Sequence, residues 1–103
     1  MGVHHWDPAD GPLSRKALTE RLEAMGYMVH CYTYPEGTYF GPHTHDVDKI
    51  DAVLEGEFLI TLAGQKIVLR AGDYVEVPKG TVHTAEVVGL KPVVSLDALK
   101  VGG

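Results

Sequence analysis

The chain has 103 residues, of which 45% are hydrophobic and 22% are charged, a composition typical of one small globular domain. It carries 14 acidic and 9 basic residues, so its formal net charge is -5, and the basic residues are scattered singly or in pairs. Proteins that bind nucleic acids usually concentrate basic residues on one surface, so we expect no nucleic-acid partner.

The cysteine content and the hydrophobic runs indicate the cellular compartment of the protein. The single cysteine, Cys31, cannot form an intrachain disulfide, which favours a reducing compartment. No apolar run approaches the roughly 20 residues that span a bilayer, and the first residues lack a basic region followed by an apolar stretch. We therefore expect a cytoplasmic protein with no membrane partner.

The N-terminal quarter of the chain predicts an arm followed by one helix. Residues 1–12 are polar, contain two prolines and show no hydrophobic period, so they are interpreted as an arm. A helix is predicted over residues 14–25, because Ser14 can cap its N-terminus. Apolar residues recur along it at spacings of four and three, and should pack on another element: Leu18, Leu22 and Met25.

From residue 27 onward the hydrophobic period changes to two, which is typical of strands. Eight short strands are predicted, at residues 27–34, 38–45, 49–54, 57–62, 66–69, 73–77, 82–88 and 93–96. Turns rich in glycine and proline separate them, so the pattern predicts an all-β fold, an antiparallel sandwich or barrel. The expected organisation is an N-terminal arm and helix over residues 1–26 and a β-domain over residues 27–103.

Three histidines in this β-region form a candidate metal site. His43 and His45 are separated by one residue in a predicted strand, so both rings should point to the same face. His83 opens a later strand that can fold back beside the first. Neutral imidazoles bind Zn, Fe, Ni, Cu or Mn, and three of them leave coordination positions for water or substrate.

Two segments around these histidines resemble the two motifs of the cupin superfamily. The first has a glycine, His43-Thr44-His45, a lysine and a second glycine, and the second has a glycine, Pro78-Lys79-Gly80 and His83. The remaining positions are Gly37, Lys49 and Gly56 in the first motif and Gly72 in the second. The resemblance covers roughly residues 27–98, and the short stretch between the two motifs, residues 57–71, resembles small single-domain bacterial cupins. It implies a jelly-roll β-barrel, with His43, His45 and His83 holding one divalent transition metal ion, Fe, Mn, Zn or Ni.

Lys49 is where the sequence departs from this pattern. Cupins usually carry a glutamate ligand at the position of Lys49, so a four-ligand site does not carry over. In a strand that begins here, Lys49 and Asp51 share one face. Three arrangements follow: a Lys49–Asp51 ion pair below a three-histidine metal, Asp51 reaching the metal, or Lys49 replacing the metal as an anion-binding group. The first arrangement is preferred.

Two functions fit these residues. The first is a metal-dependent enzyme, oxygenase or isomerase-like, that acts on a small polar or anionic molecule oriented by Lys49. The second is a binding module that holds a small ligand without catalysis. The lysine at position 49 favours this hypothesis, because the usual glutamate ligand of the metal is missing. A homodimer is expected in either case, because Trp6 and the helix present apolar surfaces that a second subunit could cover.

Overall fold

The computed structural model describes residues 2–102. This part of the chain forms nine strands, one α-helix and one short 3-10 helix. The helices are η1 (Pro8–Asp10) and α1 (Arg15–Ala24). The strands are β1 (Val3–His5), β2 (Tyr27–Tyr34), β3 (Tyr39–His43), β4 (Lys49–Glu55), β5 (Glu57–Leu62), β6 (Gln65–Leu69), β7 (Asp73–Val77), β8 (His83–Val88) and β9 (Val93–Lys100).

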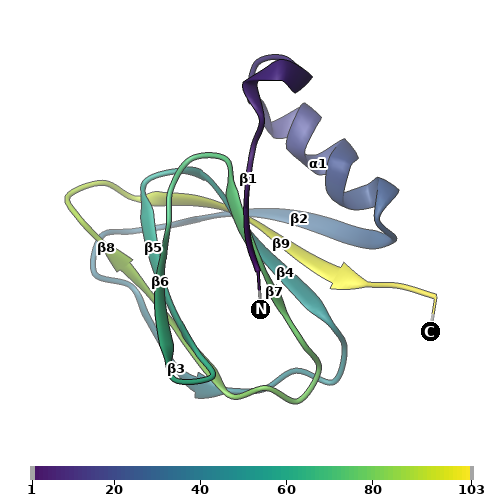
Figure 1. The fold of residues 1–103 in the computed structure, drawn as a ribbon. Helices are drawn as coiled ribbons and strands as arrows, with labels where there is room; N and C mark the ends of the chain where they lie inside the picture. Colours follow the sequence, from purple (N-terminus) through teal and green to yellow (C-terminus); the bar gives the residue numbers. More distant parts are fainter. Residues whose placement is uncertain (1, 103) are drawn as a thin grey trace.

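The strands form two antiparallel sheets that face each other, with α1 lying outside them (Figure 1). One sheet has five strands in the order β1-β7-β4-β9-β2, and the other has four in the order β3-β8-β5-β6. Neighbouring strands are mostly distant in sequence, as in a jelly roll. The prediction of an all-β, antiparallel jelly-roll fold with a short N-terminal helix is confirmed, although the two sheets do not join into a closed ring.

Gly56 takes the chain from β4 in one sheet to β5 in the other. Its φ of 85° lies in the left-handed region, which side chains with a Cβ adopt rarely. A Cβ at this position would lie only 2.5 Å from the carbonyl oxygen of Pro92. The close approach of the two backbones therefore requires glycine here.

The five-stranded sheet carries a buried apolar cluster on each face, because it packs on the second sheet and on α1. The cluster between the sheets contains ten buried residues: Val53, Phe58, Ile60, Leu62, Leu69, Val75, Val77, Ala85, Val87 and Val93. The cluster under the helix contains seven: Leu18, Leu22, Ile50, Ala52, Tyr74, Leu96 and Ala98. Alternation along β4 sends Ile50 and Ala52 toward α1, so Lys49 and Asp51 face the space between the sheets.

Helix α1 begins where the sequence predicts. The Ser14 side chain accepts a hydrogen bond from the amide of Ala17 at 3.0 Å, and Leu18 and Leu22 are completely buried. Met25 departs from the predicted stripe, because it lies at the C-terminal cap and is 37% exposed. The apolar stripe is thus covered by the chain's own sheet, and so it no longer supports the expected homodimer.

The interpretation of residues 1–12 as an arm missed a strand. β1 pairs antiparallel with β7, and the pairing is reinforced by contacts of His5 with Asp73 at 2.6 Å and of His4 with Glu76 at 2.9 Å. Three residues are too few for a period of two to show in the sequence. The N-terminal residues therefore complete the five-stranded sheet.

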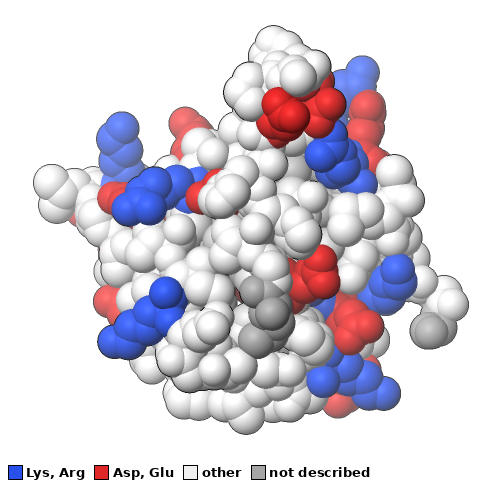
Figure 2. Space-filling view, in the orientation of Figure 1, with Lys and Arg blue, Asp and Glu red and all other residues white. Residues whose placement is uncertain are grey.

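Charged side chains of both signs are interspersed on the face shown in Figure 2. Within residues 2–102, no helix combines the length and the apolar character needed to cross a membrane.

Candidate metal centre

The three histidines come from two neighbouring strands of the four-stranded sheet. His43 is the last residue of β3, and His83, the first residue of β8, is its partner in the sheet register. His45 lies beyond the end of β3, so the prediction that it shares a strand with His43 is wrong. The register of β3 shifts between Phe40 and His43, around a proline that cannot donate to the ladder, and the strand ends at His43.

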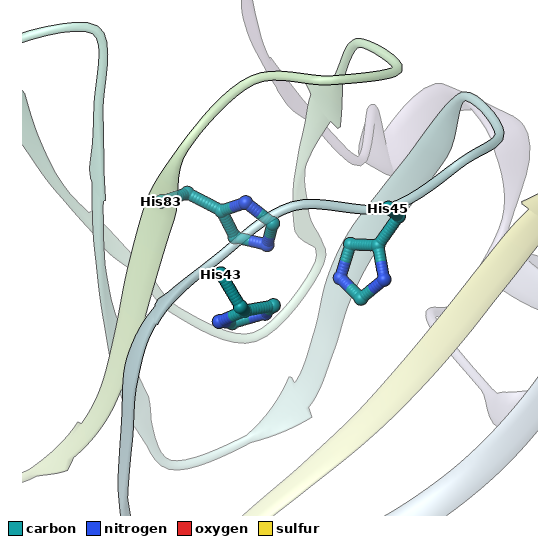
Figure 3. Close-up of side chains that lie close together, drawn as sticks. All are labelled: His43, His45 and His83. Carbon is teal, nitrogen blue, oxygen red and sulfur yellow. The ribbon is translucent and has the colours of Figure 1, made fainter.

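The three rings nevertheless converge, and we call them the histidine cluster (Figure 3). One ring nitrogen from each residue lies within 4.8 Å of the others, so His43, His45 and His83 could hold a single metal ion. The ring centroids of His43 and His83 are 4.1 Å apart, and that of His45 lies 4.8 and 5.1 Å from them. His45 thus reaches the predicted site from the loop after β3, and not from the same strand as His43.

The backbone fixes which nitrogens are free to bind. His43 Nδ1 lies 2.6 Å from the carbonyl oxygen of Gly41, and His83 Nδ1 lies 3.0 Å from that of Thr81. An Nδ1–H that donates to a carbonyl leaves Nε2 with its lone pair exposed, which is how metal-binding histidines are usually oriented. His45 Nε2 is buried and has no hydrogen-bond partner in the described part of the chain. Buried polar atoms rarely remain unpaired, so these residues fit a bound divalent ion.

The environment also keeps two of the rings neutral. Burial is the largest cause that lowers the pKa of His45 and of His83. The positive charge of Lys49 and the neighbouring histidines lower both further. Metal binding requires neutral imidazole, so both residues are ready to act as ligands at neutral pH.

A cavity of about 160 Å³ opens beside the histidine cluster. Aromatic side chains form one wall, where Tyr34 packs edge-on against Phe40 and stacks on Phe58. Charged and polar side chains line the rest of the space. The complete lining is Tyr34, Phe40, His43, His45, Lys49, Asp51, Phe58, His83, Ala85, Ser95 and Asp97.

Lys49 and Asp51 share one face of β4, as the alternation predicted, and this face points into the cavity, where both residues are only 8% exposed. The prediction of an ion pair between Lys49 and Asp51 is wrong, because Lys49 Nζ pairs with Asp97 Oδ1 at 2.5 Å. Asp97 of β9 lies directly opposite Asp51 of β4 in the sheet register. We call these three residues the charged trio.

Asp97 was missed because the predicted strand ended at residue 96, whereas β9 continues to Lys100. A charged residue followed by alanine weakens strand propensity, but pairing with β2 on one side and β4 on the other extends the strand. Continued alternation after Val93 and Ser95 was the signal that could have placed Asp97 on the inner face.

Burial and the neighbouring Asp97 raise the pKa of Asp51 to about 6, although Lys49 acts in the opposite direction. Burial is the largest of these causes, and a hydrogen bond between the two carboxyl groups adds to it. Asp51 can therefore gain and lose a proton close to neutral pH.

This raised pKa predicts that Asp51→Asn stabilises the metal-free protein above pH 6. Between the ordinary value of 3.8 and about 6, folded Asp51 holds a proton that the unfolded chain has lost, so its contribution to stability falls as pH rises. At pH 7.5 the variant should gain about 1 to 3 kcal/mol in free energy of unfolding, and the gain should vanish near pH 4. Urea titrations in EDTA from pH 4 to 8 measure it. Glu57→Gln is the surface control, and a loss of stability in Asp51→Asn at pH 7.5 would contradict the assignment.

A comparison with protein families agrees with this architecture. The sequence model of the family described as "Cupin domain" matches residues 30–99. The chain therefore belongs to the cupin domain family.

Particular relatives add detail. The pectin degradation protein KdgF of Dickeya dadantii is 30% identical over 79 residues, which are 76% of this chain and 69% of that protein. The structure of KdgF from Halomonas sp. superposes with a TM-score of 0.64 at 28% identity, covering 75% of this chain and 71% of the other. A cupin protein from Bacteroides fragilis has the same TM-score at 26% identity, covering 84% and 75%.

Proposed function

We propose that the chain binds one divalent transition metal ion, Fe, Mn, Zn or Ni, through His43, His45 and His83, and uses it to transform a small polar or anionic molecule. The buried, unpartnered Nε2 of His45 within the histidine cluster carries the proposal. The oriented Nδ1 groups of His43 and His83 support it, since they leave the opposite nitrogens free.

The charges around the cavity favour an anionic ligand. Three neutral imidazoles, a divalent ion, one ammonium and two carboxylates leave one net positive charge in the loaded site. A single carboxylate on the ligand would balance it, and the ammonium of Lys49 can orient that group. The Dickeya relative is a pectin degradation protein, and pectin is built from acidic sugars, so a sugar acid is a suitable candidate.

The chemistry that this site supports best is isomerase-like proton transfer. A bound divalent ion would supply Lewis acidity that polarises a carbonyl or hydroxyl oxygen. The carboxyl pair of Asp51 and Asp97 can take a proton from a neighbouring carbon and return it elsewhere, since the pKa of Asp51 lies near neutrality. Lys49 contacts the substrate in this proposal, and the aromatic wall offers an apolar surface to the rest of the molecule.

A second candidate is a binding module that holds a small ligand without turnover. It is favoured by the ion pair between Lys49 and Asp97, which leaves the ammonium less available to act on a substrate. Measurements of C–H exchange on small hydroxy acids in D₂O separate the two functions.

Calorimetric titration of untagged, EDTA-treated protein with Mn(II), Fe(II), Zn(II) and Ni(II) tests the metal site. We expect one ion to bind per chain, and the absence of binding by all four would remove the proposal. The loaded protein is then incubated in D₂O with small hydroxy acids, galacturonate included, and followed by NMR. Metal-dependent C–H exchange supports the isomerase-like enzyme, whereas binding without exchange supports the binding module.

The proposal retains a homodimer and a cytoplasmic location. The support for a dimer is the edge strand β2, on which Met28 and Tyr32 are exposed hydrophobic residues next to a free sheet edge. Sedimentation velocity at micromolar concentration would show a monomer if this part of the proposal is wrong.

A further inference from the structure

A lysine beside a cation site calls for an explanation, because like charges repel. Lys49 lines the same cavity as the histidine cluster and is almost completely buried. Its positive charge also lowers the pKa of His45 and His83, so its field reaches both rings. A divalent ion bound to those rings would be repelled by the same field.

The contacts of Lys49 supply the explanation. Its Nζ lies 2.5 Å from Asp97 Oδ1, and Asp51 lies opposite Asp97 across the two central strands. A buried ammonium needs such a partner, because an isolated buried charge is strongly unfavourable. The pair of carboxyl groups thus directs the ammonium toward β9 and offsets its charge.

We propose that Asp97 is a positioning residue of the metal centre: by pairing with Lys49 it cancels the charge that would otherwise weaken cation binding by the histidine cluster. Asp51 assists as the second carboxyl group of the charged trio. The trio is then electrically neutral or negative, so a cation can bind although a lysine faces the cavity. The inference rests on the proposed function, since it concerns the same metal site.

The test is metal affinity in four variants, measured by titrating untagged, metal-free protein with Mn(II). Asp97→Asn keeps the shape but removes the carboxylate that contacts the ammonium and leaves only Asp51 to offset its charge, so affinity should fall by about tenfold or more. Adding Lys49→Met to Asp97→Asn removes both charges and should restore affinity to within about threefold of the wild type. Lys49→Met alone leaves two carboxyl groups unopposed and should bind most tightly.

Glu57→Gln is the matched control for net charge. Glu57 lies at the opposite end of β5 from Leu62, which pairs with His83, so this variant removes one carboxylate away from the histidine cluster. It should leave the affinity for Mn(II) unchanged. Circular dichroism of each metal-free variant checks that it is folded. If Asp97→Asn does not fold, the comparison of Lys49→Met with the double variant still decides, since the single variant should bind more tightly.

Wild-type affinity in Asp97→Asn, or a double variant as weak as Asp97→Asn, would overturn the inference. The first result would show that the charge of Lys49 does not reach the cation, and the second that Asp97 acts by another route. Both of these results can be obtained only if the wild type binds Mn(II). Failure of the wild type to bind any of the four metals overturns the proposed function itself, so the two failures are distinguishable.

Discussion

Replacing His83 with alanine should lower the affinity for Mn(II) and Zn(II) by at least about 100-fold, the upper end of the effect seen when only a supporting residue outside the coordination sphere is lost. His83 lies opposite His43 in the sheet and points its free nitrogen at the shared space of the histidine cluster. Two histidines alone cannot hold the ion as firmly, because no carboxylate in the described chain joins the cluster. Calorimetric titration of the untagged variant measures the change.

His30→Ala is the matched control for this experiment. His30 lies on the edge strand β2, is exposed, and takes no part in the cluster. Its loss should leave affinity within the error of the titration. Equal affinities for wild type and His83→Ala would show that the metal binds elsewhere, and a similar loss in His30→Ala would indicate binding at surface histidines.

Replacing Leu22 with alanine should lower the free energy of unfolding by about 2 to 5 kcal/mol, the usual range for a fully buried leucine. Leu22 is completely buried between α1 and the outer face of the five-stranded sheet, where Ile50 and Ala52 lie in the same cluster. The sheet cannot close the gap without moving β4, so most of the cavity should remain. Urea denaturation of the metal-free protein measures the loss.

Met25→Ala is the control on the same helix. Met25 is 37% exposed at the C-terminal cap, so its truncation should cost less than about 1 kcal/mol. Equal losses in the two variants would contradict the buried stripe. A change in Leu22→Ala that lies within error would show that α1 contributes little to the fold.

Local patterns predicted those parts of the molecule that depend on neighbouring residues. Alternation along β4 placed Lys49 and Asp51 on one face, and helical spacing identified a stripe of which Leu18 and Leu22 are buried. Both patterns are set by backbone geometry within one element, so a single segment carries them.

Features that depend on contacts between distant segments were not predictable in this way. β1 exists because β7, about 70 residues later, offers it an edge, and three residues alone carry no strand signal. The pairing of Lys49 with Asp97 likewise depends on the register between β4 and β9. His45 reaches the site from a loop whose course the spacing of two histidines does not specify.

The orientation of His43 and His83 depends on main-chain carbonyl groups, and the identity of the side chains in the sequence does not indicate these contacts. Every residue at positions 41 and 81 supplies the same acceptor, provided that the backbone keeps its path. Gly41 has an ordinary φ, and a Cβ there would meet only a Tyr39 ring carbon at 3.8 Å, so alanine fits. Position 41 therefore accepts alanine while its carbonyl oxygen continues to orient His43, so this part of the site does not depend on the glycine side chain.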